Sequence, residues 1–396
     1  RLVPFYNPHK GRPGHSLRIL VATSILARLR HLSNRKVIEA MQENRSMQYF
    51  CHVPDDRLMT FVNPSTLCRW RQRLGKEGTL IVEDQVFMHL KRAGAIDADM
   101  MLMDTTVLES PIMYPTDVRL LYKAFGKMAA LAREGQIALW WDPTHIKQRW
   151  RAYNLNLKDR LAYLQEFSTV FVPAFARFAA HLDPLPQGPL RQRWSHLLEV
   201  LTLLNAQTQQ KLAGETHIDH RLVSLDDLDA RPIKKGKSYP STEFGTTLQM
   251  TFNRQGFMIT TDNFIGQPND TTLYGPTLER FRERMHAYPG TAVTDLGFRS
   301  AKNLKRNAQA IAHVFMGRSA DVDEAQQEDC RKARSATEGF SAVAKHLRGF
   351  GRSLSRGLHG VTLWTRLSQC AYNLKKFLQL YRAEALEEST LLKLRL

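Results

Sequence analysis

Two short apolar segments of this chain each end in an aspartate, and this repeated pattern constrains the fold more than any other feature. The first, at 100–107, runs through Asp104 into β-branched residues that suit a pleated backbone. In the second, at 290–297, the strand-like run ends at Asp295. A buried carboxylate is costly unless it is paired or used. One such residue is commonly a turn cap or the partner of an Arg, so the functional interpretation of Asp104 depends on finding partners elsewhere in the chain.

The period of apolar residues changes along the chain from helical to strand-like near residue 243. Leucine-rich stripes with helical spacing predict helices through 118–214. The elements expected after that stretch are, in order, strands at 243–252 and 257–261 joined by a turn at 253–256, a helix at 276–286 with Pro276 in its first turn, the strand at 290–297, a helix from Ser300, a strand at 311–315, and helix from Ala333 to the C-terminus. Trp140, Trp141 and Trp150 of the helical stretch could stack on bases, but buried packing is the commoner role of tryptophan.

Residues 1–95 are predicted to form a helical N-terminal domain. Helices are expected at 17–29, at 34–42 with Ser33 as N-cap, and from the Asn63-Pro64 step. Pro54 should interrupt the helical structure. A further helix is expected at 81–99. The segment 65–74 is similar to the second helix of a helix-turn-helix unit, which would make it a DNA-reading helix. It carries three arginines that could instead form a solvated face: Arg69, Arg71 and Arg73.

The charge of the chain favours a polyanionic partner. Lys and Arg number 56 against 38 Asp and Glu, which gives a net charge of +18 and a pI near 9.9. Nucleic acid is the first partner to consider, although ribosomal and membrane-surface proteins are also basic. Four scattered cysteines without C-x-x-C spacing argue against a structural zinc site and a disulfide framework, and they fit a reducing cytoplasm. No apolar run reaches the roughly 18 residues that span a bilayer, and no signal peptide is visible.

A third carboxylate stands out near the C-terminus. Residues 331–356 contain seven Lys and Arg but one acid, Glu338. That acid could be an ion-pair hub, or a metal ligand beside bound DNA phosphates. Two further acids near strands, Asp262 and Asp270, have a smaller chance of being metal ligands. Asp262 lies just past a hairpin strand and is the first of the two to check.

The order of these elements is that of a ribonuclease-H-like α/β core at 96–396 with a helical insertion at about 118–235. The chain resembles bacterial insertion-sequence transposases of the DDE type, in the broad IS-four/IS-five-like group. The passages that carry the resemblance are Asp104-Thr105-Thr106-Val107, Tyr114-Pro115-Thr116-Asp117, Glu243-Phe244-Gly245, Gly266-Gln267-Pro268-Asn269-Asp270, Thr294-Asp295-Leu296-Gly297-Phe298, the helix around Glu338, and, in the N-terminal domain, Gly11-Arg12-Pro13-Gly14 and Ser65-Thr66-Leu67.

The resemblance implies a catalytic, metal-binding triad of Asp104, Asp295 and Glu338. The family often shows Tyr, Arg, Glu and Lys on the helix of the third carboxylate. Arg334 and Lys345 stand at the Arg and Lys positions, whereas Arg331 replaces the Tyr and could serve its phosphate contact electrostatically. These three residues and Arg348 are therefore expected to bind DNA.

The implied chemistry is DNA cleavage and strand transfer with two Mg²⁺ ions about 4 Å apart, for which Mn²⁺ could substitute. The expected partners are double-stranded DNA, both the terminal inverted repeats and the target, and a second copy of the chain. The expected location is the bacterial cytoplasm, in association with the nucleoid. Two alternatives stay open, a domesticated DNA-binding protein without catalysis and a ribonuclease-H-like nuclease without strand transfer.

Overall fold

The chain forms two compact units in a computed structural model that describes residues 2–5, 15–53, 62–156, 159–236, 241–307, 310–317 and 323–382. The first unit contains Arg1–Pro111 and Gly245–Leu396, and the second is the insert Ile112–Phe244. The expected Pro54 break and the Gly11–Gly14 passage lie outside the described residues. No helix in the described part of the chain is long and apolar enough to cross a membrane.

The insert is helical, as its apolar stripes predict. Its elements are α5 (Asp117–Glu134), α6 (Pro143–Leu155), α7 (Arg160–Ala180), α8 (Pro189–Leu212) and the short strand β2 (Arg231–Ile233). Its core includes the expected stripes of α5 and α8, and Trp141 is buried in it. Trp150 stacks on Tyr122 with ring centroids 4.6 Å apart, so the tryptophans pack within the insert.

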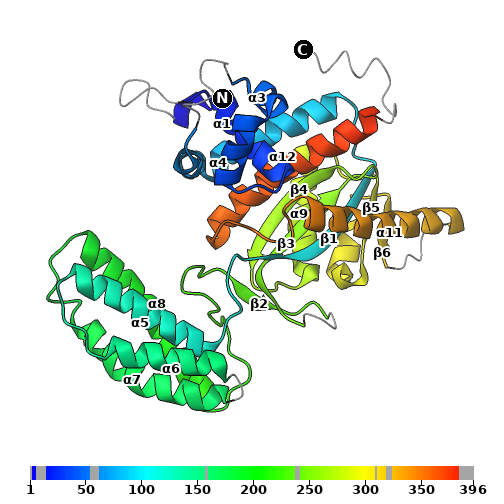
Figure 1. Cartoon of the computed structure of the whole chain (residues 1–396). Helices are drawn as coiled ribbons and strands as arrows, with labels where there is room; N and C mark the ends of the chain where they lie inside the picture. The colour runs from blue at the N-terminus through cyan, green and yellow to red at the C-terminus, as the bar shows by residue number, and fades with distance from the viewer. Residues whose placement is uncertain are drawn as a thin grey trace. The chain divides into compact units, whose positions relative to one another are not determined.

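A mixed sheet forms the centre of the first unit (Figure 1). Its strands are β1 (Met100–Glu109), β3 (Glu243–Phe252), β4 (Met258–Ile265), β5 (Thr291–Thr294) and β6 (His313–Met316). They lie in the order β4-β3-β1-β5-β6. β3 is antiparallel to both β1 and β4, whereas β5 is parallel to both β1 and β6. The hairpin, the strand that contains Asp104 and the strand that leads to Asp295 are confirmed.

Helices cover both faces of this sheet. Leu102 and Val293 pack against α11 (Glu324–Leu347) and α12 (Gly357–Arg382). Met101 and Met103 point to the opposite face and pack against α9 (Asp270–Met285) and the end of α4 (Pro64–Arg92). Side chains alternate between the faces of a strand, so Asp104 shares the α11 face with Leu102, and Thr105 points towards α9.

α12 also closes the outer edge of the sheet. β4 pairs with β3 along one side, and an open edge leaves backbone groups without partners. Asn373 accepts from the Met258 N–H and donates to its carbonyl, both at 2.8 Å. Gln369, one turn earlier, donates to the carbonyls of Met258 and Ile259. The polar stripe of α12 thus replaces a missing strand.

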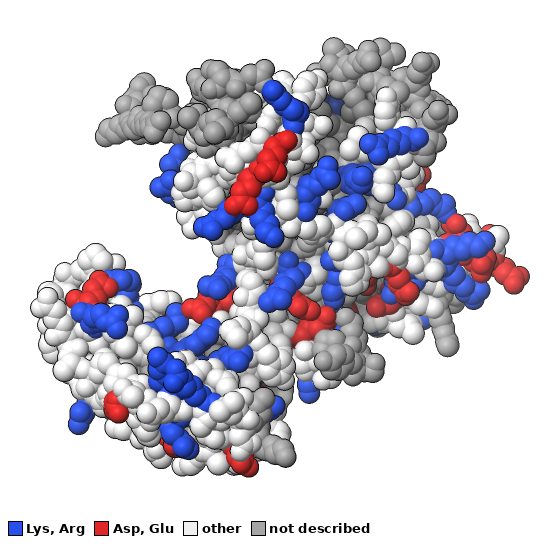
Figure 2. All heavy atoms as spheres, viewed as in Figure 1, with Lys and Arg blue, Asp and Glu red and all other residues white. Residues whose placement is uncertain are grey.

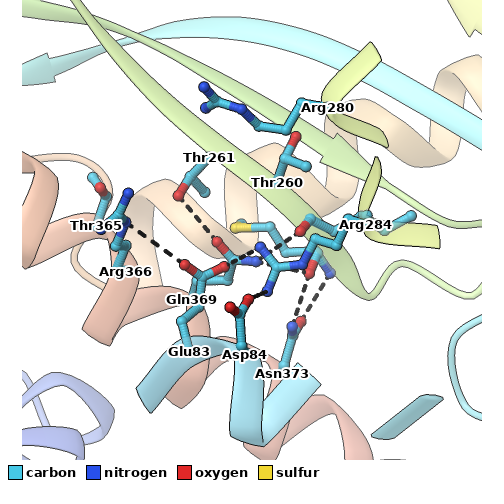
Figure 3. Close-up of polar contacts among 12 residues, drawn as sticks. Glu83, Asp84, Thr260, Thr261, Arg280, Arg284, Thr365, Arg366, Gln369 and Asn373 are labelled. Carbon is cyan, nitrogen blue, oxygen red and sulfur yellow. Dashed lines mark hydrogen bonds and ion pairs between the residues drawn. The ribbon is translucent and has the colours of Figure 1, made fainter. Parts of the chain in front are cut away.

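A buried ion cluster connects three helices beside this edge (Figure 3). Glu83 of α4, with its side chain 4% exposed, pairs with Arg284 of α9 and lies 3.8 Å from Nε of Arg366 of α12. Asp84 lies 3.5 Å from the other side of the Arg284 guanidinium. The second half of α4 is therefore held to the core by charge as well as by apolar packing.

The N-terminal helices have a core of their own. It is formed by α1 (Leu17–Leu29), α2 (Asn34–Glu43), α3 (Arg45–Cys51) and the first half of α4, after the short 3-10 turn η1 (Val3–Phe5). Ser33 caps α2 as expected, accepting from the Lys36 N–H at 3.3 Å. A second small cluster of Ile25, Val82 and residues of α12 joins these helices to the rest of the first unit. Whether residues 1–95 act as a separate DNA-binding domain stays a prediction.

Two expected helix boundaries near α4 and α9 are wrong. The helix expected at 81–99 is the second half of α4, which ends at Arg92 because Gly94 takes a positive φ of 74° and closes the last turn. α9 begins at Asp270, six residues before Pro276, with Asn269 as N-cap. Pro276 lies inside α9 rather than in its first turn, so proline was a misleading start signal there.

The C-terminal region is two helices rather than one from Ala333. α11 starts at Glu324, and a break separates it from α12. Gly349 has a φ of 79°, and the segment after it pairs with the end of β1 through the Glu109 N–H, which donates to Gly351 O at 3.0 Å. The remaining short elements are η3 (Leu296–Phe298) and α10 (Ala301–Asn307), the latter at the expected place.

Candidate active site

Asp104 and Asp295 come together where the short strand β5 ends beside the longer β1. The pairing of β1 with β5 covers Met100–Leu102 and Thr291–Val293. Continued by two residues, this register puts Asp104 opposite Asp295, and the charge of Asp295 acts on the Asp104 carboxyl. Neighbouring strands lie about 4.8 Å apart. The sequence predicted Asp104 at the end of its strand, but β1 continues past Asp104 to Glu109 against β3. It stands just beyond the part of β1 that β5 covers.

The Asp104 carboxylate is held by two hydrogen bonds. Oδ1 accepts from the Thr105 N–H at 3.0 Å, and Oδ2 accepts from the Ser341 hydroxyl of α11 at 2.7 Å. Burial raises the pKa of the Asp104 carboxyl, and the charge of Asp295 adds to this, whereas Ser341 and the Arg334 guanidinium act against it. The group is thus oriented and placed where its charge costs free energy unless a cation is near.

Arg334 lies between the other two predicted carboxylates. Its Nη2 is 4.0 Å from Oδ2 of Asp295 and 3.7 Å from Oε1 of Glu338. The Glu338 side chain is 70% exposed, against 21% for Arg334. Nη1 of Arg334 is buried and has no hydrogen-bond partner among the described residues. Arg334 therefore links the Asp295 and Glu338 carboxylates, and its charge also acts on the Asp104 carboxyl.

One face of α11 carries these groups. Successive steps of three and four residues return to the same side of a helix, and the residues so aligned are Arg331, Arg334, Glu338, Ser341 and Lys345. An adjacent stripe containing Cys330, Thr337 and Ala344 is buried and packs towards β1 and β5. The sequence pattern around Glu338 therefore corresponds to one side of α11 next to the strand ends.

Asp270 belongs to this neighbourhood, and Asp262 does not. Oδ1 of Asp270 accepts from the Thr105 hydroxyl at 3.1 Å. A Cβ on Gly297 would lie 3.1 Å from Oδ1 of Asp295 and 3.2 Å from Oδ2 of Asp270, so both carboxylates border this glycine. Asp262, the acid given priority from the sequence, lies within β4 and instead pairs with Arg280 of α9.

The sequence did not place Asp270 beside Asp295 because α9 was expected to begin at Pro276. Asn269 followed by an Asp is an N-cap and first-turn pattern, and it would have placed Asp270 at the start of a helix that follows a strand. The contact residues Ser341 and Thr105 had no such signal, since a hydroxyl that orients a carboxylate is recognised by position alone.

The other predicted DNA contacts are spread over two regions. Arg331 is exposed and lies 3.7 Å from Glu328, and Lys345 is partly buried further along α11. Arg348, just past α11, donates to the Leu347 carbonyl, and burial lowers the pKa of its guanidinium. In α4, Arg69 and Arg73 are exposed, whereas Arg71 is partly buried.

Arg71 is also tied to a neighbouring helix, because its Nη2 donates to the Asn34 side chain of α2 at 3.1 Å. Arg69, whose Nη2 donates to the Ser65 hydroxyl at 3.4 Å, and Arg73 are the more exposed of the three arginines expected to contact DNA.

The donor set suits a hard divalent cation, although the side chains are not gathered around one point. In the described part of the chain, no three His, Cys, Asp or Glu side chains lie close enough to enclose a metal ion. Mg²⁺ is commonly held by one or two carboxylates together with water and phosphate oxygens. Asp104 and Asp295 are two carboxylates whose like charges repel each other. Their residue type and their positions suit a shared Mg²⁺ ion.

Comparison with known proteins gives two matches. Residues 1–73 match the family model described as "Transposase domain (DUF772)". The chain is also similar to the "Uncharacterized protein ORF8 in nfe locus" of Rhizobium meliloti, with 30% identity over 148 residues that make up 37% of this chain and 71% of that relative. No solved structure matches the chain.

Proposed function

We propose that this chain, which belongs to the same family as the ORF8 protein of Rhizobium meliloti and carries a transposase domain at its N-terminus, is a DDE transposase of the IS-four/IS-five-like group. It cleaves DNA at the ends of an insertion element and joins those ends to a target. The observation that carries the proposal is the meeting of Asp104 and Asp295 in one register, with Arg334 linking Asp295 to Glu338.

The arrangement of the sheet supports a ribonuclease-H-like core. Three antiparallel strands, β4, β3 and β1, are followed by β5 and β6 parallel to β1, and a helix after the last strand carries the third carboxylate. Such cores place acidic residues on neighbouring strands. Asp295 directly follows β5, and Asp104 lies in β1 just beyond the part that β5 covers. The insert 112–244 follows the first strand and leaves this order intact.

The reaction exchanges phosphodiester bonds. Water attacks a phosphodiester at the element end and releases a 3′-hydroxyl, and this hydroxyl then attacks a target phosphodiester, so that one such bond forms as another breaks. Asp104, Asp295 and Glu338 would hold two Mg²⁺ ions, or Mn²⁺ in their place, which supply activated water and neutralise the leaving alkoxide. No energy-rich cofactor is needed for the joining step.

The remaining side chains orient the carboxylates and the DNA. Ser341 and the Thr105 N–H fix the rotamer of Asp104. The partly exposed guanidinium of Arg334 lies beside Asp295 and Glu338 and forms a charge-assisted bond with a phosphate oxygen of the cut strand. Arg331, Lys345 and Arg348 continue the phosphate contacts along α11.

End recognition belongs to the N-terminal helices. Arg69 and Arg73 project from α4, with Arg71 behind them, and contact the terminal inverted repeats. Because an element has two ends that must be joined together, two copies of the chain act on one element.

A cleavage and strand-transfer assay on DNA carrying the inverted repeats that flank the gene tests the proposal. Asp104→Asn, Asp295→Asn and Glu338→Gln should each reduce Mg²⁺-dependent cleavage to background while binding of the DNA ends persists, since each removes a charged ligand and no phosphate contact. Glu324→Gln is the matched control, because Glu324 is an exposed acid in the first turn of the same helix. It should cut like wild type.

The two alternatives give different results in the same assay. A wild-type protein that binds the ends but never cuts them would be a DNA-binding protein without catalysis. A protein that cuts but never joins a 3′-end to a target would be a nuclease. Near-full cleavage by Glu338→Gln would remove Glu338 from the triad.

A further inference from the structure

Asp270 stands at the junction of three elements of the proposed active site. It is the first residue of α9, after the Asn269 N-cap, and α9 packs against η3, the turn that Asp295 caps. Its Oδ1 accepts from the hydroxyl of Thr105, the neighbour of Asp104 in β1. The start of α9 is therefore tied to the strand that carries the first catalytic carboxylate.

The Asp270 and Asp295 carboxylates approach each other beside Gly297. Oδ1 of Asp295 accepts from the Gly297 N–H at 3.0 Å, and Oδ2 of Asp270 lies 3.2 Å from the point where a Cβ of Gly297 would stand. A side chain at this position would meet both oxygens at distances tighter than most Cβ contacts. The absence of a side chain on Gly297 thus allows two acids from different elements to face the same space.

No basic side chain in the described part of the chain pairs with Asp270. Asp262 has Arg280, and Asp295 has Arg334 at 4.0 Å, but the contact of Asp270 is the neutral Thr105 hydroxyl. The two carboxylate oxygens of Asp295 also lie next to different neighbours. Oδ1 lies by Gly297 and Asp270, whereas Oδ2 lies by Arg334 of α11.

We infer that Asp270 is a further carboxylate ligand of the proposed active site and shares one divalent cation with Asp295. This inference rests on the proposed function. A pair of carboxylates, with water and a DNA phosphate completing the shell, is an ordinary way for proteins to hold Mg²⁺. Asp295 then joins a cation on the α9 side to the groups on the α11 side, where Asp104 and Glu338 lie.

A purely structural role for Asp270 is the competing explanation. An acid in the first turn of a helix interacts favourably with the helix dipole and needs no ligand. That role affects the stability of α9 equally with and without divalent cations, whereas a ligand affects stability mainly in their presence. The two roles therefore differ in a measurement that does not depend on catalysis.

The experiment titrates Mn²⁺ into the full-length protein, alone and with a DNA end duplex, by calorimetry. Asp270→Asn should weaken Mn²⁺ binding at least tenfold or remove one bound ion. It should also lose the rise in melting temperature that Mn²⁺ gives the wild-type protein. Asp262→Asn is the matched control, an acid-to-amide change at an acid paired with Arg280, and its Mn²⁺ affinity should equal that of the wild type.

Each outcome decides either the inference or the proposed function. Wild-type Mn²⁺ affinity and cleavage in Asp270→Asn, with both lost in Asp104→Asn, would overturn the role of Asp270 and leave the function standing. Weaker Mn²⁺ binding in Asp270→Asn, with no cation-dependent cleavage by the wild-type protein, would support the ligand and overturn the function. No Mn²⁺ binding by the wild-type protein, with or without DNA, would overturn both. A melting temperature lowered equally with and without Mn²⁺ would assign Asp270 to the helix alone.

Discussion

Glu83 shows how a single buried charge holds this molecule together. Its side chain is 4% exposed and lies among Arg284, 13% exposed, and Arg366, 18% exposed (Figure 3). Three helices from distant parts of the chain meet there. Burying such charges is costly, and the attraction between them recovers that cost while every partner is present.

Replacing Glu83 should therefore destabilise the protein strongly. Glu83→Gln leaves Arg284 and Arg366 without their buried counter-charge, and the expected loss in unfolding free energy is about 3–5 kcal/mol. Urea denaturation with two independent probes measures it. Asp84→Asn is the control, since Asp84 contacts the same Arg284 but is 46% exposed, and its loss should stay under about 1 kcal/mol. Similar small losses in both variants would mean that water already screens the cluster.

At the scale of elements, α4 is two helices joined at one glycine. Gly75 has φ 59° and ψ −160°, a backbone conformation that is essentially restricted to glycine. The half before it carries the arginines expected to contact DNA, and the half after it carries Glu83 and packs on the core. The break thus separates the segment that we propose contacts DNA from a segment fixed by the ion cluster.

Gly75→Ala should lower the unfolding free energy by about 1–3 kcal/mol, because an alanine cannot adopt this conformation without strain. Gly126→Ala in α5 provides a control of opposite sign. Gly126 is exposed inside a regular helix and a Cβ there meets nothing within 4 Å, so alanine should stabilise by about 0.5–1 kcal/mol. Both values come from denaturant unfolding. Stabilisation by Gly75→Ala would indicate that α4 is continuous in solution.

The elements also show which parts of the fold could be predicted from sequence. Alternation and turn residues gave the hairpin of β3 and β4, and the repeated apolar segment with a terminal Asp gave β1 and β5. Both signals are local, because they reflect how neighbouring side chains fit a pleated backbone. The break between α11 and α12 was not predictable in this way, since it exists because residues near Gly351 pair with the end of β1.

The candidate site likewise combines residues that could be predicted from sequence with contacts that could not. Asp104, Asp295 and Glu338 were predicted from residue type, position on an element and resemblance to a family, and their roles stay predictions. The register between β1 and β5, the Ser341 bond to Asp104 and the approach of Asp270 to Asp295 depend on contacts between residues far apart in sequence. Sequence patterns name such residues as candidates, but only the packing of α9 and α11 on the strands brings them together.

At the scale of the whole molecule, positive charge is distributed over both compact units. On the face drawn in Figure 2, Lys and Arg cover parts of each unit and Asp and Glu are interspersed among them. A net charge of +18 spread in this way favours association with any DNA, independent of sequence. Any contribution of the α4 arginines to recognition of element ends must therefore be separated experimentally from this general attraction.

Deleting residues 1–95 is a poor way to make that separation. Ile25 of α1 and Val82 of α4 pack against Leu367, Cys370 and Ala371 of α12, all buried. Deletion would expose this apolar surface and remove Glu83 from the ion cluster, so lost binding could follow from lost folding. Point substitutions on the exposed side of α4 avoid both effects.

Binding to element ends should fall linearly with the logarithm of salt concentration, because each neutralised phosphate releases condensed counterions and contributes about −0.9 to the slope. Arg69→Ala and Arg73→Ala should each reduce the slope by about one, since both side chains are exposed on the first half of α4. Arg71→Ala is the matched control from the same helix. Its guanidinium is already bonded to Asn34, so its slope should change less.

Fluorescence anisotropy on duplexes of the element end and of unrelated sequence measures the salt slope of all three variants. A flat salt plot would contradict phosphate binding altogether, whereas equal losses on both duplexes would show that α4 contacts the backbone without reading bases.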